Sequence, residues 1–498
     1  MPPTPKGVGG RLRPVLGLIR SPAELEGRFS LRRFAQSAGV LSLKSVTDFA
    51  RAVIAAKLFA VTLGPTLVGV QAQLFNFQAL VGAVLPLGLS TGVSKMIAED
   101  TRDVPRVSSV VLTSSAIALA AGVVAALVLT PVVPQLATAL TGSGRYELPV
   151  LLLVWSFPLY NLGGVVYYQL QGLAAVKRLT RAGILTTVFA VAALIPLTVA
   201  YGLTGTMVSV LVTSVAQAIF FSFELWREYA ARGWRFAGAA FNRPIARQLL
   251  GFGWILLISA VFTWASVVVV RTLTLHTLGQ HANGLYQVVF GLSGQFAAVF
   301  LAWMGAYVFP RLVAEAGSPR LGSLLNSGLR ANLAIMVPFF VVAIALRDPL
   351  IRIFYSSAFV AAAPLIPIQV FGDYLRVIGW SFAVCLFAVG RTGSHLAVIA
   401  GQAVLWVVLA FLMVPIWGLN AVPIAYTVSY LAYPVLGFAL VRRWTGAGPD
   451  RRAWMLIALA AVCVAGAAAP FYTGILLAPV MPVLVYVLNR REMRQAAA

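Results

Sequence analysis

Charged residues at helical spacing interrupt an apolar stretch, and their types suit the binding of an anion. Residues 44–59 read KSVTDFARAVIAAKLF and carry Lys44, Asp48, Arg51 and Lys57. On a helix that turns about 100° per residue, Lys44, Asp48 and Arg51 share one face, and Lys57 points nearly the opposite way. A charge in the middle of a membrane span costs about 2.5–3.5 kcal/mol, so this stripe must face protein or water rather than lipid.

A second polar stripe has the same character. Gln369, Asp373 and Arg376 follow one another at helical spacing inside another apolar run, and Arg271 interrupts a third run. Two interpretations stay open for both stripes. Each is either an internally neutralised structural pair, since Asp48 is spaced to pair with Lys44 and Arg51, or part of a cationic cavity.

Bases outnumber acids within the predicted spans, which favours an anionic ligand. A phosphate or pyrophosphate group would satisfy them, because arginine binds such groups through two parallel hydrogen bonds. The predicted anion-binding residues are Arg51, Arg376, Lys44, Arg271 and Lys57. Asp48 and Asp373 are expected to hold the arginines in place or to take up a coupling proton.

Other polar side chains in the spans are candidates for lining a sugar-accommodating cavity. They supply hydrogen-bond donors, acceptors and a stacking ring, although such residues also form ordinary bonds between membrane helices. The candidates are Gln71, Asn76, Gln78, Asn161, Tyr168 and Gln369.

Composition places the chain in the membrane. Of its 498 residues, 60% are hydrophobic and 10% are charged, which is typical of an integral membrane protein. The net charge of +23 does not indicate nucleic-acid binding, because most of the bases fall in short loops. Neither the two cysteines nor the three histidines have the spacing of metal ligands, and no catalytic motif is present. We therefore expect no metal, no cofactor and no enzymatic activity.

The apolar runs predict an all-α polytopic fold with about fourteen transmembrane helices. If the N-terminus is cytoplasmic, nearly all loop lysines and arginines fall on the cytoplasmic side, and the opposite loops hold only Arg145, Arg347 and Arg352. Both termini are then cytoplasmic. The predicted spans are 35–60, 66–92, 107–130, 148–171, 181–202, 205–226, 248–271, 283–309, 329–346, 364–389, 394–415, 419–441, 453–470 and 472–489.

An internal repeat divides these spans into two halves. The segment LGPTLVGVQAQLFNFQ begins at Leu63 and the similar segment LGQHANGLYQVVFGLS begins at Leu278. Six spans per half give the halves the same polarity, so we expect two parallel-related six-helix lobes around a central cavity. The expected divisions are a basic cytoplasmic segment 1–34, an N-lobe 35–228, a cytoplasmic linker 229–247, a C-lobe 248–442 and a C-terminal helix pair 453–489.

Three longer runs carry a family resemblance over roughly residues 35–442. They are LGPTLVGVQAQLFNFQALVGAVLPLGLSTGVSK, NGLYQVVFGLSGQFAAVFLAWMGAYVFPRL and DPLIRIFYSSAFVAAAPLIPIQVFGDYLRVIGWSFAVCLFAVGRT. They resemble the polysaccharide-biosynthesis (Wzx-type) flippases of the multidrug/oligosaccharidyl-lipid/polysaccharide exporter superfamily. The motifs consist mainly of glycine, proline and small-residue positions.

The resemblance implies a flippase that works by alternating access in a bacterial cytoplasmic membrane. Its implied cargo is a polyprenyl-pyrophosphate-linked oligosaccharide, and its implied partners are the lipid bilayer and a polysaccharide polymerase or glycosyltransferases. Fourteen spans are closer to the lipid II flippases of peptidoglycan synthesis, so lipid II is an alternative cargo. The basic N-terminal extension is unlike those flippases. A non-transporting scaffold for polysaccharide assembly is a third interpretation, but it leaves the charges within the membrane unexplained.

Overall fold

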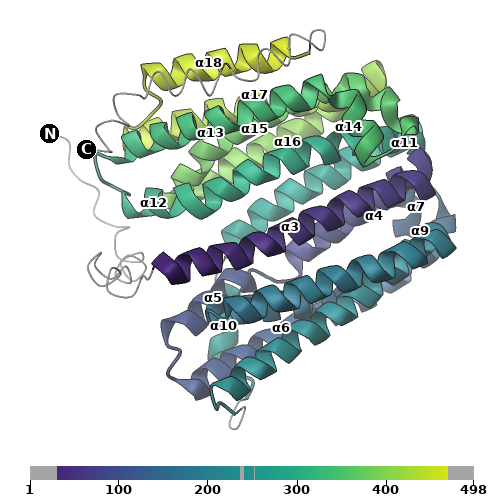
Figure 1. Cartoon of the computed structure of the whole chain (residues 1–498). Coiled ribbons are helices and arrows are strands. Elements are labelled where there is room, and N and C mark those ends of the chain that lie inside the picture. The colour runs from purple at the N-terminus through teal and green to yellow at the C-terminus, as the bar shows by residue number, and fades with distance from the viewer. Residues whose placement is uncertain (1–30, 236–239, 252, 469–479, 481–498) are drawn as a thin grey trace.

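The fold is entirely helical in the part of the chain that is described. The computed structural model describes residues 31–235, 240–251, 253–468 and 480, and these residues form helices and turns without a β-strand (Figure 1). Eight of their helices are long and apolar enough to cross a membrane. The predicted all-α polytopic class is confirmed. The predicted span 472–489, apart from residue 480, and most of the segment 1–34 lie outside the described residues.

The first bundle contains the helices up to residue 231. Apolar residues dominate them, and a helix is the form in which one segment satisfies its own backbone polar groups within lipid. Its elements are α3 (Leu31–Thr62), α4 (Gly64–Val84), α5 (Leu89–Glu99), α6 (Val104–Leu129), the 3₁₀ turn η1 (Thr130–Val132), α7 (Val133–Thr141), η2 (Gly144–Tyr146), α8 (Glu147–Gly172) and α9 (Val176–Ala231).

The second bundle follows the short amphipathic helix α10 (Arg243–Gly251), which packs against α5 and α6 of the first bundle. It continues through α11 (Trp254–Trp303), the π-helical η3 (Met304–Val308), α12 (Phe309–Ala314), α13 (Leu321–Ala345), α14 (Arg347–Phe354), η4 (Ser357–Leu365), α15 (Ile366–Ala388), α16 (Thr392–Trp417), η5 (Gly418–Asn420) and α17 (Ala421–Thr445). Helix α18 (Arg451–Gly466) lies along its outer side against α13 and α15 (Figure 1).

Two of the long helices are hairpins that fold back at a glycine. Gly202 within α9 and Gly279 within α11 have positive φ angles of 58° and 88°, a conformation that glycine adopts without steric cost. A hydrogen bond of 3.0 Å joins Arg271 to Gln287 across the second turn. Sixteen residues of continuous helix would separate these two side chains by about 24 Å, so the chain reverses here.

The predicted span 66–92 is broken near its end. Helix α4 ends at Val84, and the turn that follows contains Pro86 and two residues with positive φ, Leu87 and Gly88. The side-chain amide of Asn161 donates hydrogen bonds to the carbonyl oxygens of Leu85 and Ala118, at 3.2 and 2.7 Å. It thereby satisfies a carbonyl that the end of α4 leaves without a helical partner.

The two bundles meet along α4 and α11, and several interbundle hydrogen bonds lie near one end of the molecule. We call this end, where α7, α14 and the Gly279 turn gather, the α14 end, and the opposite end the α12 end (Figure 1). Asn283 donates to the carbonyl of Gly69 at 3.0 Å, and Gln280 donates to that of Thr141 at 2.7 Å.

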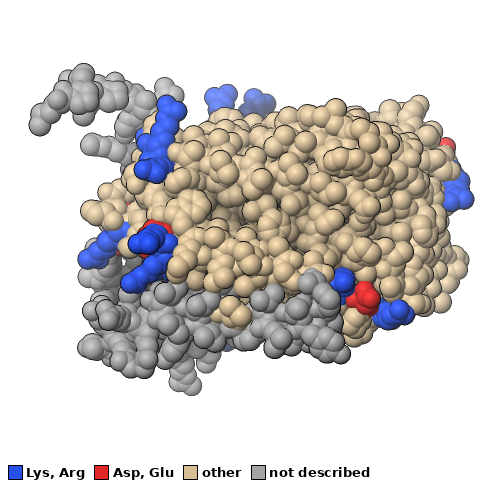
Figure 2. All heavy atoms as spheres, turned by 90° about the horizontal axis from the view of Figure 1, so that it is seen from above, with Lys and Arg blue, Asp and Glu red and all other residues tan. Residues whose placement is uncertain are grey.

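The surface is organised as expected for a protein that crosses a bilayer. Figure 2 shows Lys, Arg, Asp and Glu side chains near the edges of one face, and the broad central area of that face is free of them. An uncharged band between charged edges matches the hydrocarbon core and its two interfaces. The boundaries of the two predicted lobes stay a prediction.

Candidate functional site

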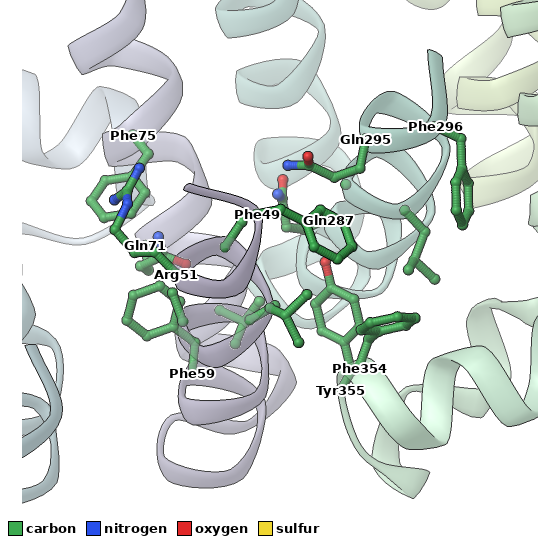
Figure 3. Close-up of a pocket in the computed structure, with 17 residues that line it drawn as sticks. Phe49, Arg51, Phe59, Gln71, Phe75, Gln287, Gln295, Phe296, Phe354 and Tyr355 are labelled. Atoms are coloured by element: carbon green, nitrogen blue, oxygen red, sulfur yellow. The ribbon is translucent and has the colours of Figure 1, made fainter. Parts of the chain in front are cut away.

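An interbundle cavity of about 300 Å³ lies between α3 and α4 on one side and α11 and the segment after α14 on the other. Figure 3 shows Arg51, Gln71 and Phe75 on the first side, facing Gln287, Gln295 and Tyr355 on the second. We call it the interlobe cavity. Aromatic and aliphatic side chains supply most of its wall and amides supply most of its polar groups, as is usual in ligand pockets. The described lining residues are Phe49, Arg51, Ala52, Val53, Ala55, Ala56, Phe59, Val68, Gln71, Phe75, Gln287, Gly291, Leu292, Gln295, Phe296, Phe354 and Tyr355.

Arg51 is the one charged residue among the described residues that line the interlobe cavity. Although Asp48 lies one helical turn away, the described part of the chain offers Arg51 no ion pair and no hydrogen bond. Asp48 instead accepts a hydrogen bond of 2.9 Å from the hydroxyl of Thr187 on α9. Among the described residues, Arg51 therefore has no acidic partner, and its charge can be met by an anionic ligand. The Lys44–Asp48 part of the neutralised-pair interpretation stays a prediction, because the Lys44 side chain lies outside the described part of the chain.

A second cation lies behind the cavity wall. Arg271 is completely buried, and its guanidinium donates to Gln287 at 3.0 Å and sits 5.2 Å from the ring centre of Tyr286. Its Nε and Nη1 atoms have no hydrogen-bond partner among the described residues, and none of their carboxylates lies within ion-pair distance. A buried guanidinium without a carboxylate is unfavourable, and it raises the electrostatic potential of the nearby cavity.

Tyr355 completes this wall from the connection between α14 and η4. Burial raises the pKa of its hydroxyl to about 12, although the neighbouring Arg271 acts in the opposite direction. The phenol is therefore neutral at physiological pH and remains a hydrogen-bond donor. Gln287 and Tyr355 thus place neutral dipoles between the buried cation and the cavity.

A larger cavity of about 660 Å³ lies inside the first bundle, between α3, α4, α8 and α9. We call it the N-lobe chamber. Arg51, Phe59 and Phe75 line both cavities, so Arg51 stands at the boundary between them. The polar residues that line the chamber are Asp48, Arg51, Gln78, Tyr160, Tyr167, Tyr168, Thr186, Thr187, Ser209, Thr213, Ser214 and Gln217.

The second stripe forms an internally paired centre. Asp373 is buried, accepts a hydrogen bond of 2.6 Å from the hydroxyl of Tyr426, and lies 3.5 Å from the guanidinium of Arg376. Arg376 also contacts the Tyr426 hydroxyl at 3.5 Å and lies over the ring of Tyr430. Neither Asp373 nor Arg376 lines either cavity, so their geometry matches the structural-pair interpretation.

The remaining predicted residues separate into cavity-lining and structural positions. Gln71 lines the interlobe cavity, and Gln78 and Tyr168 line the N-lobe chamber. Asn76 is buried in α4 away from both cavities, and Gln369 accepts a hydrogen bond of 2.9 Å from Tyr286.

Two predicted cations contribute nothing visible to either cavity. Lys57 donates to the carbonyl of Arg352 at 2.9 Å, which joins the two bundles at the α14 end. Lys44 lies on α3, but its side chain is outside the part of the chain that is described.

Several residues that line the two cavities were not predicted from the sequence. Gln287, Gly291 and Gln295 stand at i, i+4 and i+8 on α11, so they share one helix face, and this spacing was visible in the sequence. Thr187 and Gln217 come from the two arms of the α9 hairpin and gave no comparable signal. Within the described residues, no group of three His, Cys, Asp or Glu side chains is arranged to hold a metal.

The fold and the cavities define a polytopic all-α membrane protein with two helical bundles and a ligand-sized cavity between them. The sequence profile of the family described as "Polysaccharide biosynthesis protein" matches residues 60–364, and the chain belongs to that family. The family resemblance inferred from the sequence is confirmed.

Individual relatives are more distant. The lipid III flippase of Escherichia coli (strain K12) is 22% identical over 387 residues, which cover 76% of this chain and 91% of the relative. An inward-facing multidrug resistance MATE family transporter of the MOP superfamily has a TM-score of 0.67 at 17% identity, over 82% of this chain and 94% of that one. Lipid II flippase MurJ in an inward closed conformation also has a TM-score of 0.67, at 14% identity, over 92% of this chain and 100% of that one. These structural similarities establish the fold.

Proposed function

We propose that this protein moves a polyprenyl-pyrophosphate-linked oligosaccharide from the cytoplasmic to the outer leaflet of a bacterial cytoplasmic membrane. Membership of a polysaccharide-biosynthesis family and similarity to a lipid III flippase support a lipid-linked glycan as the cargo. In this mechanism the anionic head passes between the two bundles and the polyprenyl tail stays in the bilayer.

The observation that carries the proposal is the position and charge environment of Arg51. This arginine lines the interlobe cavity without an acidic partner among the described residues, and the buried Arg271 adds positive potential behind the opposite wall. A pyrophosphate would supply the missing negative charge, and its oxygens would accept paired hydrogen bonds from the guanidinium. The desolvation penalty of an anion that leaves water is compensated only where the protein supplies opposite charges and hydrogen-bond donors.

The arrangement of contacts supports loading from the cytoplasmic side. The bundles are joined near the α14 end by bonds such as Lys57 to Arg352, and the basic loops predicted to be cytoplasmic lie toward the α12 end. Transport then requires the contacts at the α14 end to separate and new contacts to form at the other end. The differential binding of the cargo to the two states would drive this change.

Substitution of Arg51 tests the proposal in cells that depend on this protein for surface polysaccharide. Arg51→Ala is expected to abolish surface polysaccharide while the protein still inserts at its normal level. Arg102→Ala is the matched control, because Arg102 lies in the exposed turn between α5 and α6, away from both cavities. Normal polysaccharide in cells that carry only the Arg51→Ala variant would refute the cavity-anion mechanism.

Lipid II is the second candidate cargo, and one observation favours it. The similarity to the lipid II flippase covers the whole of that protein, including regions beyond the profile match that ends at residue 364. A rescue experiment separates the cargoes. Growth of a lipid II-flippase-depleted strain would favour lipid II, and recovery of a polysaccharide-export mutant would favour oligosaccharide units. Rescue of neither by a correctly inserted protein would favour a scaffold.

A further inference from the structure

The N-lobe chamber contains a set of polar groups that no part of the described protein satisfies. The side chains of Gln78, Gln217, Thr213, Tyr160 and Tyr167 line it without a hydrogen-bond partner among the described residues. Polar groups within a membrane protein are costly unless they are hydrogen-bonded to protein, water or a ligand. Five such groups around one cavity indicate a chamber built for a polar, hydrated occupant.

The aromatic side chains of the chamber favour a ligand with both polar edges and apolar faces. Tyr167 packs edge-on against Tyr168, with ring centres 5.2 Å apart, and its ring centre lies 5.9 Å from that of Phe221. Fixed rings of this kind offer π faces to weakly polarised C–H groups. A pyranose ring combines C–H faces with a rim of hydroxyl groups, so it complements both the rings and the amides.

The chamber differs from the interlobe cavity in its charged lining residues. Arg51 is the one charged lining residue of the interlobe cavity, whereas the chamber adds the carboxylate of Asp48, which Thr187 holds in place at 2.9 Å. A carboxylate repels a phosphate but accepts hydrogen bonds from sugar hydroxyls. The two cavities therefore suit different parts of one ligand, and Arg51 stands at their boundary.

From these observations we infer that the N-lobe chamber binds the sugars next to the diphosphate, and that it selects neutral sugars. The inference rests on the proposed function, because it places the diphosphate at Arg51. The volume of about 660 Å³ lies within the range of small-molecule sites, about 300–1,000 Å³, which suits a short saccharide. The side chains of α8 and α9, rather than those of the second bundle, then determine which glycan is bound.

Binding of two soluble probes to the full-length purified protein tests the inference. Methyl N-acetylglucosaminide is followed by saturation-transfer NMR, and inorganic pyrophosphate by calorimetry. Gln217→Leu combined with Thr213→Val is expected to weaken sugar binding about tenfold and to leave pyrophosphate binding unchanged. Arg51→Gln is expected to do the reverse. Gln248→Leu with Thr138→Val is the matched control, because both residues lie outside the chamber.

Each outcome has a defined meaning. Wild-type protein that binds pyrophosphate but not the glycoside, or glycoside binding that survives the chamber substitutions, overturns the glycan chamber and leaves the proposed function standing. Absence of pyrophosphate binding refutes the anion site on which the proposed function depends. Methyl glucuronide, which carries a carboxylate, is expected to bind more weakly than the neutral glycoside. Stronger binding of the glucuronide would overturn selection of neutral sugars.

Discussion

Gly69 on α4 and Gly284 on α11 face each other across the contact between the two bundles, at equivalent positions in the two similar segments that begin at Leu63 and Leu278. A Cβ atom on Gly69 would collide with the carbonyl oxygen of Gln280 and lie 2.7 Å from the amide nitrogen of Gly284. A Cβ atom on Gly284 would collide with the carbonyl oxygen of Pro65 and lie 3.2 Å from the amide nitrogen of Gly69. The contact is reciprocal, as expected where a two-fold axis relates two similar halves.

Substitution of either glycine should therefore disturb the contact between the two bundles near the α14 end. Gly284→Ala is expected to force α4 and α11 apart, at a cost of about 1–3 kcal/mol, because backbone atoms cannot rotate out of the way. The measurement is the rate at which a thiol reagent labels the Val68→Cys variant, which should rise because Val68 is buried beside Gly69. Gly294→Ala on the same helix is the control, since a Cβ atom there would meet no heavy atom within 4 Å. Equal labelling in both variants would contradict a closure formed by the glycine pair.

The buried Arg271 should reduce the stability of the ligand-free protein. Arg271→Met removes a buried charge that has no carboxylate partner in the described structure, so we expect the free energy of unfolding to rise by about 1–4 kcal/mol. Transport should fall at the same time, because the cavity loses positive potential. Thermal unfolding in detergent provides the measurement, and a lower melting temperature would contradict the expectation.

Arg376 provides the contrasting case for the same measurement. Arg376→Met would leave Asp373 buried without its guanidinium partner, while the Tyr426 hydroxyl would still donate to it. Breaking one partner of a buried pair costs about 3–5 kcal/mol; Arg376 is partly exposed, so we expect the lower part of this range. A stabilising effect would show that the pair is strained rather than structural.

Lys57 and Arg51 should differ in their effect on anion binding. Lys57→Met removes an exposed hydrogen bond to Arg352 at the α14 end, so pyrophosphate affinity should stay within about twofold of wild type. Arg51→Met should reduce that affinity by at least about tenfold. Calorimetry with pyrophosphate measures both. A comparable loss in the Lys57 variant would place the anion nearer the α14 end than the interlobe cavity.

An ion-pair cluster should stabilise the ends of α9. Glu224 is buried and lies 3.4–3.5 Å from the guanidinium groups of Arg178, Arg181 and Arg227. Glu224→Gln removes this shared carboxylate, although Arg178 keeps its ion pair with Glu228, and we expect a loss of about 1–3 kcal/mol after allowance for the partial exposure of the cations. Added salt should reduce the difference from wild type. The exposed Glu147→Gln is the control, and an equal loss there would rule out the cluster as the cause.

Much of the fold could be predicted from the sequence, because membrane insertion leaves a strong local pattern. Long apolar runs predict spans because a helix must match the thickness of the bilayer. Basic loops support this division because lysine and arginine are enriched in cytoplasmic loops. The break after Val84 was missed, since Pro86 and Gly88 are tolerated within membrane helices as well as at their ends. The repeat was inferred from the similar segments that begin at Leu63 and Leu278, and Gly69 and Gly284 lie at equivalent places within them.

The candidate site was only partly predictable, and the two charged stripes show why. The sequence alone determined that Asp48–Arg51 and Asp373–Arg376 each lie on one helix face, because that depends on the helical period. The tertiary structure decided that Thr187 donates to Asp48 and that no carboxylate in the described part of the chain pairs with Arg51, whereas Tyr426 and Arg376 both contact Asp373. Identical local spacing gives opposite outcomes because side chains from distant helices decide whether a buried charge is neutralised.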